Sequence, residues 1–282
     1  MEVPAEVGVL GGGTMGAGIA HAFVVSGSRV TLVERDDEAA SAARGRLEKS
    51  LARAAEKTGL DAAEALTRLS FSTDYADFNS VDLVVEAVPE EMSLKVSALT
   101  RVEENLHDTA WLASNTSSLS ITDIAKELMR PERFCGLHFF NPVPTSSLVE
   151  VVLAPTTSEE LSSLAVQWIR GLGKTPIVVN DAPGFASSRL GLAIALEAMR
   201  MLEEGVASAE DIDTAMVLGY RHATGPLKTT DLVGLDVRLD IAEYLHKTLG
   251  ERFAPPQILR DKVARGELGR KSGKGFFDYP SS

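Results

Sequence analysis

Two polar residues interrupt apolar, β-type stretches of the sequence and could take part in chemistry. His138 stands near the end of the run 134–139, and Glu150 lies within the run 148–153. Ligands bind at the carboxyl ends of strands in an open α/β sheet, so His138 is a candidate general base. The alternative is a histidine whose hydrogen bonds are satisfied within the core. Glu150 is unusual in such a run, because burying an unpaired carboxylate costs several kcal/mol.

A glycine-rich loop follows the first predicted strand, residues 7–10. It reads Gly11-Gly12-Gly13-Thr14-Met15-Gly16 and contains the pattern G-x-G-x-x-G. In dinucleotide-binding loops the first glycine permits a tight turn, the second lets the backbone approach a pyrophosphate, and the third lets the helix pack on the sheet. A helix predicted over 14–26 would point its free N–H groups at the phosphates. We therefore expect a dinucleotide to bind at Gly11, Gly13, Thr14, Met15 and Gly16, the alternative being a glycine-rich turn without a ligand.

Glu34 ends the second predicted strand, residues 28–34, and stands 18 residues after Gly16. A carboxylate there would hold the adenosine ribose hydroxyls of a dinucleotide, and it would repel the 2′-phosphate of NADP. The sequence therefore favours NAD as the cofactor. Arg35, the next residue, leaves NADP open as the alternative.

The elements that must position these residues change in type near residue 182. Before that point, apolar β-type runs alternate with helical patterns, which is typical of a parallel sheet built from βαβ units. The predicted strands are 7–10, 28–34, 81–87, 110–114, 134–139, 148–153 and 175–179. The longest predicted helix, 37–58, ends at Gly59, and Asp61 with Glu64 forms a capping-box pattern for the next helix.

Beyond residue 182 the β-type runs largely disappear. Helices are predicted over 185–204, 209–218 and 237–248, with Ser208 as the cap of the second. The first of them is apolar around much of its circumference, so it should be buried within its own domain or against another subunit. We therefore predict an α/β fold in two domains. A dinucleotide-binding domain with a mostly parallel sheet spans 1–182, and an all-helical domain spans 183–282.

The composition narrows the class of protein. The chain has 282 residues, 44% hydrophobic and 24% charged, which is typical of a globular protein. Its net charge of −12 would repel phosphate backbones, so we expect no nucleic-acid partner. We expect no membrane association, since no stretch is long and apolar enough for a span, and no basic region of a signal peptide is present. The single cysteine, Cys135, precludes an intrachain disulfide and gives no reason to expect a metal, which favours the cytoplasm.

Several longer motifs make the sequence similar to a known family. Besides the glycine loop they are Ser114–Leu119, His138–Val143, Leu148–Val152, Asp181–Phe185, Glu210–Asp213, Gly225-Pro226, Asp231–Asp236 and Gly269–Phe276. In one register from about residue 6 to 279, the chain resembles the 3-hydroxyacyl-CoA dehydrogenases, most closely the short bacterial 3-hydroxybutyryl-CoA dehydrogenases. The resemblance implies a Rossmann-type NAD-binding domain, followed by an all-helical domain that binds substrate and forms a dimer.

The resemblance also implies roles for individual residues. His138 matches the catalytic histidine that takes the proton of the C3 hydroxyl group. Glu150 matches the carboxylate that hydrogen-bonds the other imidazole nitrogen, and this partnership would explain a glutamate in an apolar run. Ser117 matches a serine that hydrogen-bonds the substrate oxygen near the nicotinamide. Asn141 matches an asparagine beside the histidine, for which we expect a role in shaping the site.

Further matches concern the cofactor and the thioester carrier. Glu90 and Lys95 match residues that contact NAD, the alternative being an ordinary first-turn acid and helix lysine. Ser50 and Lys57 match residues that touch coenzyme A. The predicted helix 37–58 carries a basic stripe, formed by Arg46, Lys49, Arg53 and Lys57. The alternative for this stripe is a solvated helix face, since two glutamates stand beside it.

One motif departs from the family pattern. The family usually reads Pro-Gly-Phe-x-x-Asn-Arg where this chain has Pro183–Arg189, so Ser188 replaces an asparagine that lines the active site. Serine still forms hydrogen bonds, but its reach is shorter. We expect Ser188 to bind substrate, and to change the rate and the substrate preference rather than the class of reaction.

The sequence therefore predicts an NAD-dependent oxidoreductase of fatty acid metabolism that interconverts (S)-3-hydroxyacyl-CoA and 3-oxoacyl-CoA. The expected substrate is short, 3-hydroxybutyryl-CoA, and a homodimer through the helical domain is expected. One alternative is a related dehydrogenase for an acyl carrier protein thioester or a free 3-hydroxy acid. Another is a dinucleotide-binding protein without catalysis. Acyl chain length and the physiological direction stay open.

Overall fold

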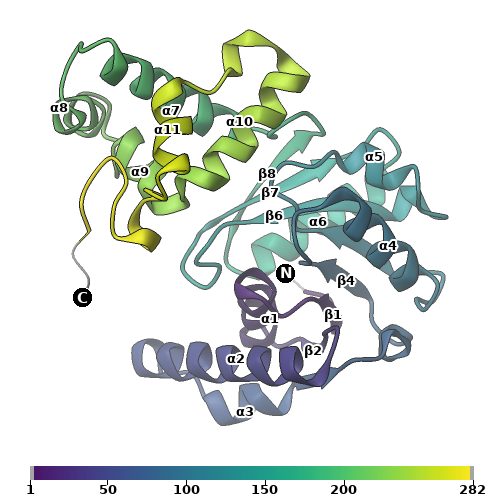
Figure 1. Cartoon of the computed structure of the whole chain (residues 1–282). Coiled ribbons are helices and arrows are strands. Elements are labelled where there is room, and N and C mark those ends of the chain that lie inside the picture. The colour runs from purple at the N-terminus through teal and green to yellow at the C-terminus, as the bar shows by residue number, and fades with distance from the viewer. Residues whose placement is uncertain (1–2, 280–282) are drawn as a thin grey trace. The chain divides into compact units, whose positions relative to one another are not determined.

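A computed structural model describes residues 3–279 and divides the chain into two units, residues 1–182 and 183–282 (Figure 1). The strands of the first unit are β1 (Glu6–Leu10), β2 (Arg29–Val33), β3 (Leu69–Ser72), β4 (Leu83–Glu86), β5 (Trp111–Ser114), β6 (Phe134–Phe139), β7 (Leu148–Leu153) and β8 (Thr175–Asn180). Its α-helices are α1 (Thr14–Val25), α2 (Asp37–Thr58), α3 (Ala62–Thr67), α4 (Met92–Glu103), α5 (Ile121–Ala125) and α6 (Glu159–Gly171).

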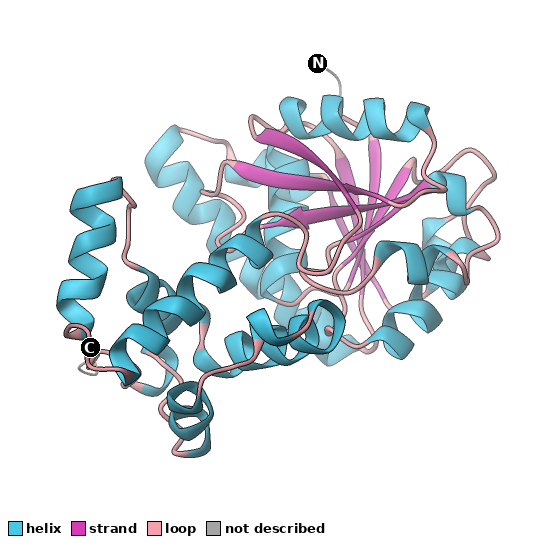
Figure 2. Cartoon of the chain, turned by 90° about the horizontal axis from the view of Figure 1, so that it is seen from above, coloured by secondary structure: helices cyan, strands magenta, loops and turns pink. Residues whose placement is uncertain are grey.

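The strands form one eight-stranded sheet in the order β3-β2-β1-β4-β5-β6-β7-β8. Neighbouring strands are parallel except β6 and β7, which pair antiparallel. Figure 2 shows helices on both faces of this sheet. The predicted α/β fold with a mostly parallel sheet is confirmed. The edge strand β3 is not predicted by the sequence pattern, since its four residues are only partly buried or exposed and do not alternate clearly.

Local capping explains why the helices of this unit begin and end where they do. Asp36 precedes α2 and accepts a hydrogen bond from the backbone N–H of Ala39, and Gly59 ends the helix with a left-handed φ of 73°. Asp61 caps α3 through the N–H of Glu64, as predicted. The Glu64 carboxylate bonds Arg68 instead of completing the capping box.

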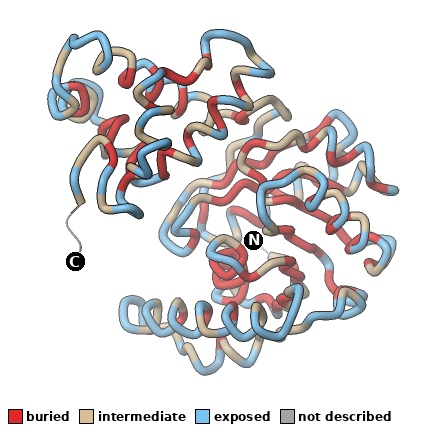
Figure 3. The backbone as a smooth tube through the Cα atoms, in the orientation of Figure 1, coloured by how far each residue is buried: buried red, intermediate tan, exposed pale blue. Residues whose placement is uncertain are grey.

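The core of the first unit lies between the sheet and its helices. Buried residues concentrate on the strands and on the inward faces of the helices (Figure 3). One apolar cluster joins Val7, Val9, Leu83 and Val85 of the central strands to side chains of α1, α2 and α6. These strand residues alternate along β1 and β4, because successive side chains in a strand point to opposite faces. The packing fixes the carboxyl ends of the central strands, where the glycine loop begins.

The second unit consists of helices. They are α7 (Ser187–Glu203), α8 (Ala209–Thr214), a π-helical turn (Ala215–Gly219), α9 (Pro226–Val233), α10 (Leu235–Leu249) and α11 (Gln257–Ala264). The predicted helix 209–218 is therefore divided into α8 and the π-helical turn, and Ser208 caps α8 as predicted. The all-helical character of this part of the chain is confirmed. Throughout residues 3–279, each helix is too short or too polar to cross a membrane.

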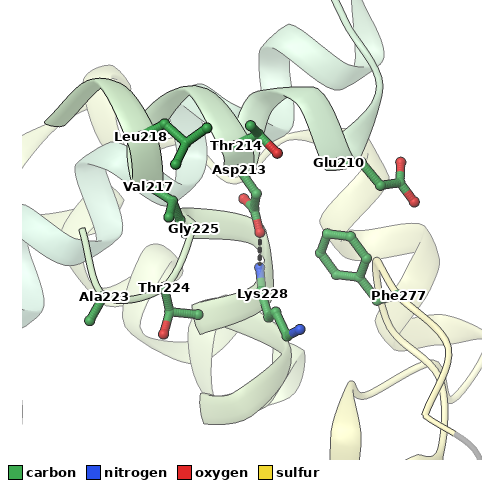
Figure 4. A pocket seen from close by; sticks show the side chains of 10 residues that line it. All are labelled: Glu210, Asp213, Thr214, Val217, Leu218, Ala223, Thr224, Gly225, Lys228 and Phe277. Carbon is green, nitrogen blue, oxygen red and sulfur yellow. Dashed lines mark hydrogen bonds between the residues drawn. The ribbon is translucent and has the colours of Figure 1, made fainter. Parts of the chain in front are cut away.

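A carboxylate from α8 caps α9. Asp213 accepts hydrogen bonds of 2.8 Å from the N–H groups of both Leu227 and Lys228, beside a cavity of about 570 Å³ in this unit (Figure 4). A Cβ atom at Gly225 would fall 2.2 Å from the Asp213 carboxyl carbon, so glycine is required there. The sequence pattern does not predict α9, because its cap comes from 14 residues earlier in the chain.

Asp231 holds the last described segment of the chain against α9. Its carboxylate accepts hydrogen bonds from the N–H groups of Phe276 (2.8 Å) and Phe277 (2.9 Å) and from the Tyr279 hydroxyl (3.1 Å). A Cβ atom at Gly275 would lie 2.0 Å from that carboxylate, so the loop closes on it only with glycine. Two of the motifs that carry the resemblance, 231–236 and 269–276, therefore act together in building the helical unit.

Candidate active site

His138 and Glu150 lie side by side on β6 and β7. The antiparallel register places them directly opposite each other. His138 Nδ1 lies 2.7 Å from Glu150 Oε2, and the two residues are 6% and 0% exposed. With the carboxylate ionised, Nδ1 donates its proton to it and Nε2 is left as the acceptor nitrogen. The pair has the arrangement of a base and the group that orients it.

A buried lysine binds the backbone of the loop that follows β6. Lys174 Nζ donates hydrogen bonds of 2.6 Å to the backbone carbonyls of Val143 and Ser146. Burial lowers the pKa of Lys174 below its usual range. Phe140 packs on the imidazole of His138 with ring centroids 4.4 Å apart, and Asn141 lies exposed on the same loop. Lys174 therefore anchors the backbone of the loop that carries Asn141, which follows closely after His138 in the sequence.

A buried network links Glu86, at the end of β4, to Lys95 on α4. Lys95 Nζ donates to Glu86 Oε1 at 2.7 Å and lies 3.3 Å from Glu90 Oε2. Ser114 donates to the other oxygen of Glu86 at 2.5 Å. Sequence reasoning missed Glu86, although a glutamate at the end of an apolar strand is the same signal that singled out Glu150. Lys95 is 1% exposed, and its ammonium group forms ion pairs with the carboxylates of both Glu86 and Glu90.

Glu90 organises the loop that carries Ser117. Its Oε1 accepts hydrogen bonds from the Thr116 hydroxyl (2.7 Å), the Ser117 N–H (2.9 Å) and the Ser118 N–H (3.1 Å). Burial opposes ionisation of Glu90, but Lys95 and these hydrogen bonds outweigh it, so the pKa of Glu90 lies below its usual range. The structure thus brings Ser117, Glu90 and Lys95 together, three residues that the sequence analysis selected.

The three glycines of the G-x-G-x-x-G pattern after β1 are glycine for different reasons. Gly11 adopts a φ of +90°, and a Cβ atom at Gly16 would fall 1.7 Å from the Gly11 carbonyl oxygen. The fold itself therefore requires both. Around a Cβ atom at Gly13 nothing lies within 4 Å. Since the chain does not need glycine at Gly13, the open space in front of it fits the close approach of a dinucleotide pyrophosphate.

The glycine loop forms one wall of a cleft of about 790 Å³ in the first unit. Its lining includes Gly11, Gly13, Thr14, Met15 and Glu34, together with apolar residues of the loop after β4 and of α4. Clefts of this size, with a few polar groups among apolar walls, are typical of cofactor sites. The cleft lies where the strand order reverses between β1 and β4, the position at which this class of sheet binds nucleotides.

Glu34 lies against the glycine loop. Its Oε1 accepts a hydrogen bond of 2.6 Å from the N–H of Gly12, and its Oε2 accepts one of 3.1 Å from the N–H of Arg35. The Arg35 guanidinium is turned to Asp36, at 3.0 Å. Arg46 donates to the Gly12 carbonyl oxygen at 3.2 Å and lines the same cleft. A negative charge therefore stands in this cleft beside the glycine loop, and the neighbouring Arg35 is paired with an acid.

The residues predicted to touch coenzyme A lie along α2. Ser50 is hydrogen-bonded to the buried His21, Oγ to Nδ1 at 2.9 Å, and Lys57 is exposed in the last turn. Burial, followed by the charge of Lys174, lowers the pKa of His21. Lys49 and Arg53 are exposed on the same helix. The remaining predicted residue, Ser188, lies in the first turn of α7 in the helical unit.

Comparisons with known proteins agree with this geometry. The NAD-binding domain of 3-hydroxyacyl-CoA dehydrogenase matches residues 6–182, and the C-terminal domain of the same family matches residues 184–279. A probable 3-hydroxybutyryl-CoA dehydrogenase of Deinococcus radiodurans is 43% identical, over 97% of this chain and 100% of the relative. One from Bacillus subtilis is 42% identical, over 99% of this chain and 98% of its own length.

A comparison with solved structures shows the same family resemblance in the fold. The crystal structure of (S)-3-hydroxybutyryl-CoA dehydrogenase from Ralstonia eutropha matches with a TM-score of 0.95 and 40% identity, over 99% of this chain and 100% of that one. The family binds NAD, and its N-terminal domain is the one that contains the glycine loop described above. The chain is an NAD-dependent oxidoreductase and belongs to the 3-hydroxyacyl-CoA dehydrogenase family.

Proposed function

We propose that this enzyme oxidises short (S)-3-hydroxyacyl-CoA thioesters, with 3-hydroxybutyryl-CoA as a substrate, and catalyses the reverse reduction. The observation that supports it best is the His138–Glu150 pair, Nδ1 to Oε2 at 2.7 Å. Nε2 of His138 takes the proton of the C3 hydroxyl group, and Glu150 stabilises the imidazolium that forms. Bound NAD supplies the nicotinamide, which accepts the hydride from C3. Ser117 holds the substrate oxygen, and Asn141 shapes the site beside the base.

The acyl-CoA carrier binds along α2 in this proposal. Lys49, Arg53 and Lys57 present positive charge on a chain whose net charge is −12, and Ser50 lies on the same helix. Such a patch suits the phosphates of coenzyme A, which a strongly acidic surface would otherwise repel. Glu90 and Lys95 are assigned to NAD binding, as the resemblance implies, with the buried Lys95 acting through Glu90, whose Oε2 lies 3.3 Å from its Nζ. Residues 1–182 form the NAD-binding domain in this proposal, and residues 183–282 form the substrate and dimerisation domain.

Steady-state assays test the substrate class. Acetoacetyl-CoA should be reduced with NADH, and longer 3-oxoacyl-CoA esters, an acetoacetyl thioester of acyl carrier protein and free acetoacetate should be compared at equal concentration. The proposal requires the CoA thioesters to have the highest kcat/KM. A higher value for free acetoacetate or for the carrier-protein thioester would contradict it.

Replacing Glu34 by alanine is expected to reduce the preference for NADH over NADPH. The carboxylate repels a 2′-phosphate, and removing it should lower the ratio of the two kcat/KM values on the order of tenfold. The ratio is the readout, because loss of the hydrogen bond to the Gly12 N–H weakens both cofactors alike. Glu38→Ala, at the same cleft, is the matched control. A wild-type enzyme that prefers NADPH would make this assignment wrong.

Replacing Gly13 by alanine should weaken NADH binding by about tenfold without lowering the melting temperature. The φ of −59° at Gly13 suits any residue, and an added methyl group meets nothing in the chain, only the space of the pyrophosphate. Gly16→Ala is the contrasting variant, since its methyl group would collide with the Gly11 carbonyl and destabilise the fold. Thermal unfolding and NADH titration separate the two effects. Unchanged NADH affinity in Gly13→Ala would contradict the placement of the pyrophosphate.

Ser188→Asn is expected to raise kcat/KM for acetoacetyl-CoA and to leave NADH binding nearly unchanged. A neutral hydrogen bond regained at the acyl end is worth roughly 0.5–1.5 kcal/mol, which corresponds to about 2- to 12-fold. Parallel assays of wild type and variant over a series of acyl-CoA esters provide the measurement. A variant that is equal or slower on every ester would mean that serine is neutral here or suited to another substrate.

A homodimer through the helical domain is part of the same proposal. Large apolar side chains of this unit are exposed: Leu190 (65%), Ile194 (39%), Leu232 (47%), Val233 (43%) and Val237 (40%). Apolar groups in this number on α7, α9 and α10 are typical of a subunit interface. Sedimentation equilibrium at micromolar concentration should give twice the mass of 30.1 kDa.

We also propose a cytoplasmic location for the enzyme, supported by the single buried cysteine, Cys135.

A further inference from the structure

Glu86 is a completely buried acid to which the proposed function gives no role. It ends β4, in the middle of the sheet, and is 0% exposed. Its Oε1 accepts hydrogen bonds of 2.7 Å from Lys95 Nζ and from the N–H of Val88, and its Oε2 accepts one of 2.5 Å from the Ser114 hydroxyl. Both carboxylate oxygens therefore have donors, which hold the side chain in one orientation.

Glu86, Lys95 and Glu90, which we call the Glu86 network, carry charges that do not cancel. The Lys95 ammonium group lies 2.7 Å from Glu86 Oε1 and 3.3 Å from Glu90 Oε2, so two negative charges and one positive charge leave −1. Among residues 3–279, no second lysine or arginine forms an ion pair with either carboxylate. Because Glu86 and Lys95 are buried, water screens the excess charge only weakly.

The Glu86 network lies directly behind one wall of the NAD cleft. Val88 lines this cleft, donates its N–H to Glu86, and accepts a hydrogen bond of 3.0 Å from Lys95 Nζ through its carbonyl oxygen. On the other side of Lys95, Glu90 Oε1 accepts a hydrogen bond of 2.9 Å from the N–H of Ser117. The network therefore joins the wall of the cleft to the loop that carries Ser117.

The strand order indicates which half of the cofactor faces this network. The adenosine ribose is assigned to Glu34, which follows β2, and the pyrophosphate to Gly13, in the loop after β1. In the sheet, β4 is the neighbour of β1 on the side opposite to β2. A dinucleotide that crosses the ends of these strands is therefore expected to have its nicotinamide half near the end of β4. This half changes charge in the reaction, since the ring is positive in NAD⁺ and neutral in NADH.

We propose that Glu86 supplies a buried negative charge that strengthens the binding of NAD⁺ relative to that of NADH. A net negative charge attracts the positive ring of NAD⁺ and has no such attraction for the neutral ring of NADH. Lys95 and Glu90 alone would cancel, so the excess charge depends on Glu86. The inference rests on the proposed function for the position of the nicotinamide near Ser117, and deepens it by naming a residue that selects the redox state of the cofactor.

Binding titrations of wild type and Glu86→Gln, without substrate, test the proposal. Glutamine keeps the shape of the side chain, and the Ser114 hydroxyl can turn to accept from its amide. The net charge of the network then becomes zero. The ratio of the Kd for NAD⁺ to the Kd for NADH should rise about 5- to 20-fold, the range for one unit charge acting over roughly 10–15 Å at an effective dielectric constant of about 20. Calorimetry for NAD⁺ and fluorescence for NADH give the two constants.

A double variant separates the charge of Glu86 from its shape. Glu86→Gln combined with Lys95→Met removes a buried ion pair as a whole, which proteins tolerate better than the loss of one partner. Glu90 keeps its hydrogen bonds from residues 116–118, so the net charge returns to −1. The ratio should then return to within about twofold of wild type, whatever happens to the two affinities. If Glu86→Gln alone does not fold, Lys95→Met is compared with the double variant, since these two differ only at Glu86, and the ratio should again be higher without its charge.

Glu103→Gln is the matched control. Glu103 is a second buried acid, 4% exposed, at the other end of α4, where it accepts from the N–H groups of Met129 and Arg130. Its loss should lower the melting temperature but leave the ratio unchanged, because it lies about 12 Å further along the helix than Lys95.

Three outcomes would overturn the inference. They are equal weakening of NAD⁺ and NADH in Glu86→Gln, which would make Glu86 a structural residue, a double variant whose ratio stays as high as that of Glu86→Gln, and an equal shift of the ratio in Glu103→Gln. Reduction of acetoacetyl-CoA by wild type is assayed separately. A failure of the proposed substrate would appear in that assay and not in the cofactor titrations, so the two failures are distinguishable.

Discussion

Replacement of His138 by asparagine is expected to lower kcat by about 10²–10⁴-fold, the usual contribution of a positioned general base. Asparagine keeps a hydrogen-bonding group near Glu150 but cannot take a proton from the C3 hydroxyl group. The affinity for NADH should change little, because His138 lies on β6, away from the glycine loop. Stopped-flow reduction of acetoacetyl-CoA and NADH titration give the two numbers.

A matched substitution separates this effect from a general loss of structure. His107→Asn changes a histidine whose Nδ1 contacts Thr109 at an exposed position, so its kcat should equal that of wild type. If His138→Asn turned over at a near-native rate, another group would have to be the base. The chain would then be closer to a dinucleotide-binding protein that does not depend on this pair.

Glu150→Gln should reduce kcat by a similar factor, about 10²–10⁴, although it changes one atom. The amide has nearly the shape of the carboxylate but no charge, so it neither stabilises the imidazolium nor holds the Nδ1–H tautomer, and comparable replacements in catalytic triads cost about 10⁴-fold. Glu150 is completely buried and accepts from His138 at 2.7 Å, so solvent cannot replace the lost charge. The measurement is kcat for the variant over a range of pH.

A lower kcat indicates a lost catalytic role only if the variant is folded, so thermal unfolding is measured alongside the kinetics. The Glu150→Asp variant keeps the carboxylate on a shorter side chain. It should therefore retain more activity than Glu150→Gln, which loses the charge. A merely structural glutamate would produce the opposite order, because glutamine fills the same volume. Equal turnover of Glu150→Gln and wild type would contradict the assigned role.

Local signals in the sequence were sufficient for several elements. Helix α2 begins after Asp36 and ends at Gly59, and Glu34, the residue after β2, follows the glycine loop at the expected spacing. Each of these features depends on hydrogen bonds or φ angles within a few residues, which a sequence pattern contains directly. The helices α9 and α11 were missed for the opposite reason. They are short, and α9 begins on a cap supplied by Asp213.

The candidate active site, too, was predicted from the sequence only in part. Residue types and a resemblance selected His138, Glu150, Ser117 and Glu90, but no pattern states which of them touch. The antiparallel register of β6 and β7 brings His138 opposite Glu150. A register shifted by one residue would turn one of the two side chains to the other face of the sheet. Glu86 carried a local signal, but its pairing with Lys95 could not be predicted, because Lys95 lies on the next helix and becomes a neighbour only when α4 packs on β4.

The sequence by itself determined the order of the elements, the change from α/β to helical structure, the dinucleotide loop and the family. These follow from hydrophobic periodicity, turn residues and local spacing, all of which are properties of neighbouring residues. Only the tertiary structure decided which glycine the fold does not need and which carboxylate lies against which cation. Those facts depend on distances between segments far apart in the chain and on the exclusion of water between them. Burial and pairing, which set the cost of a charge, arise only when the segments pack together.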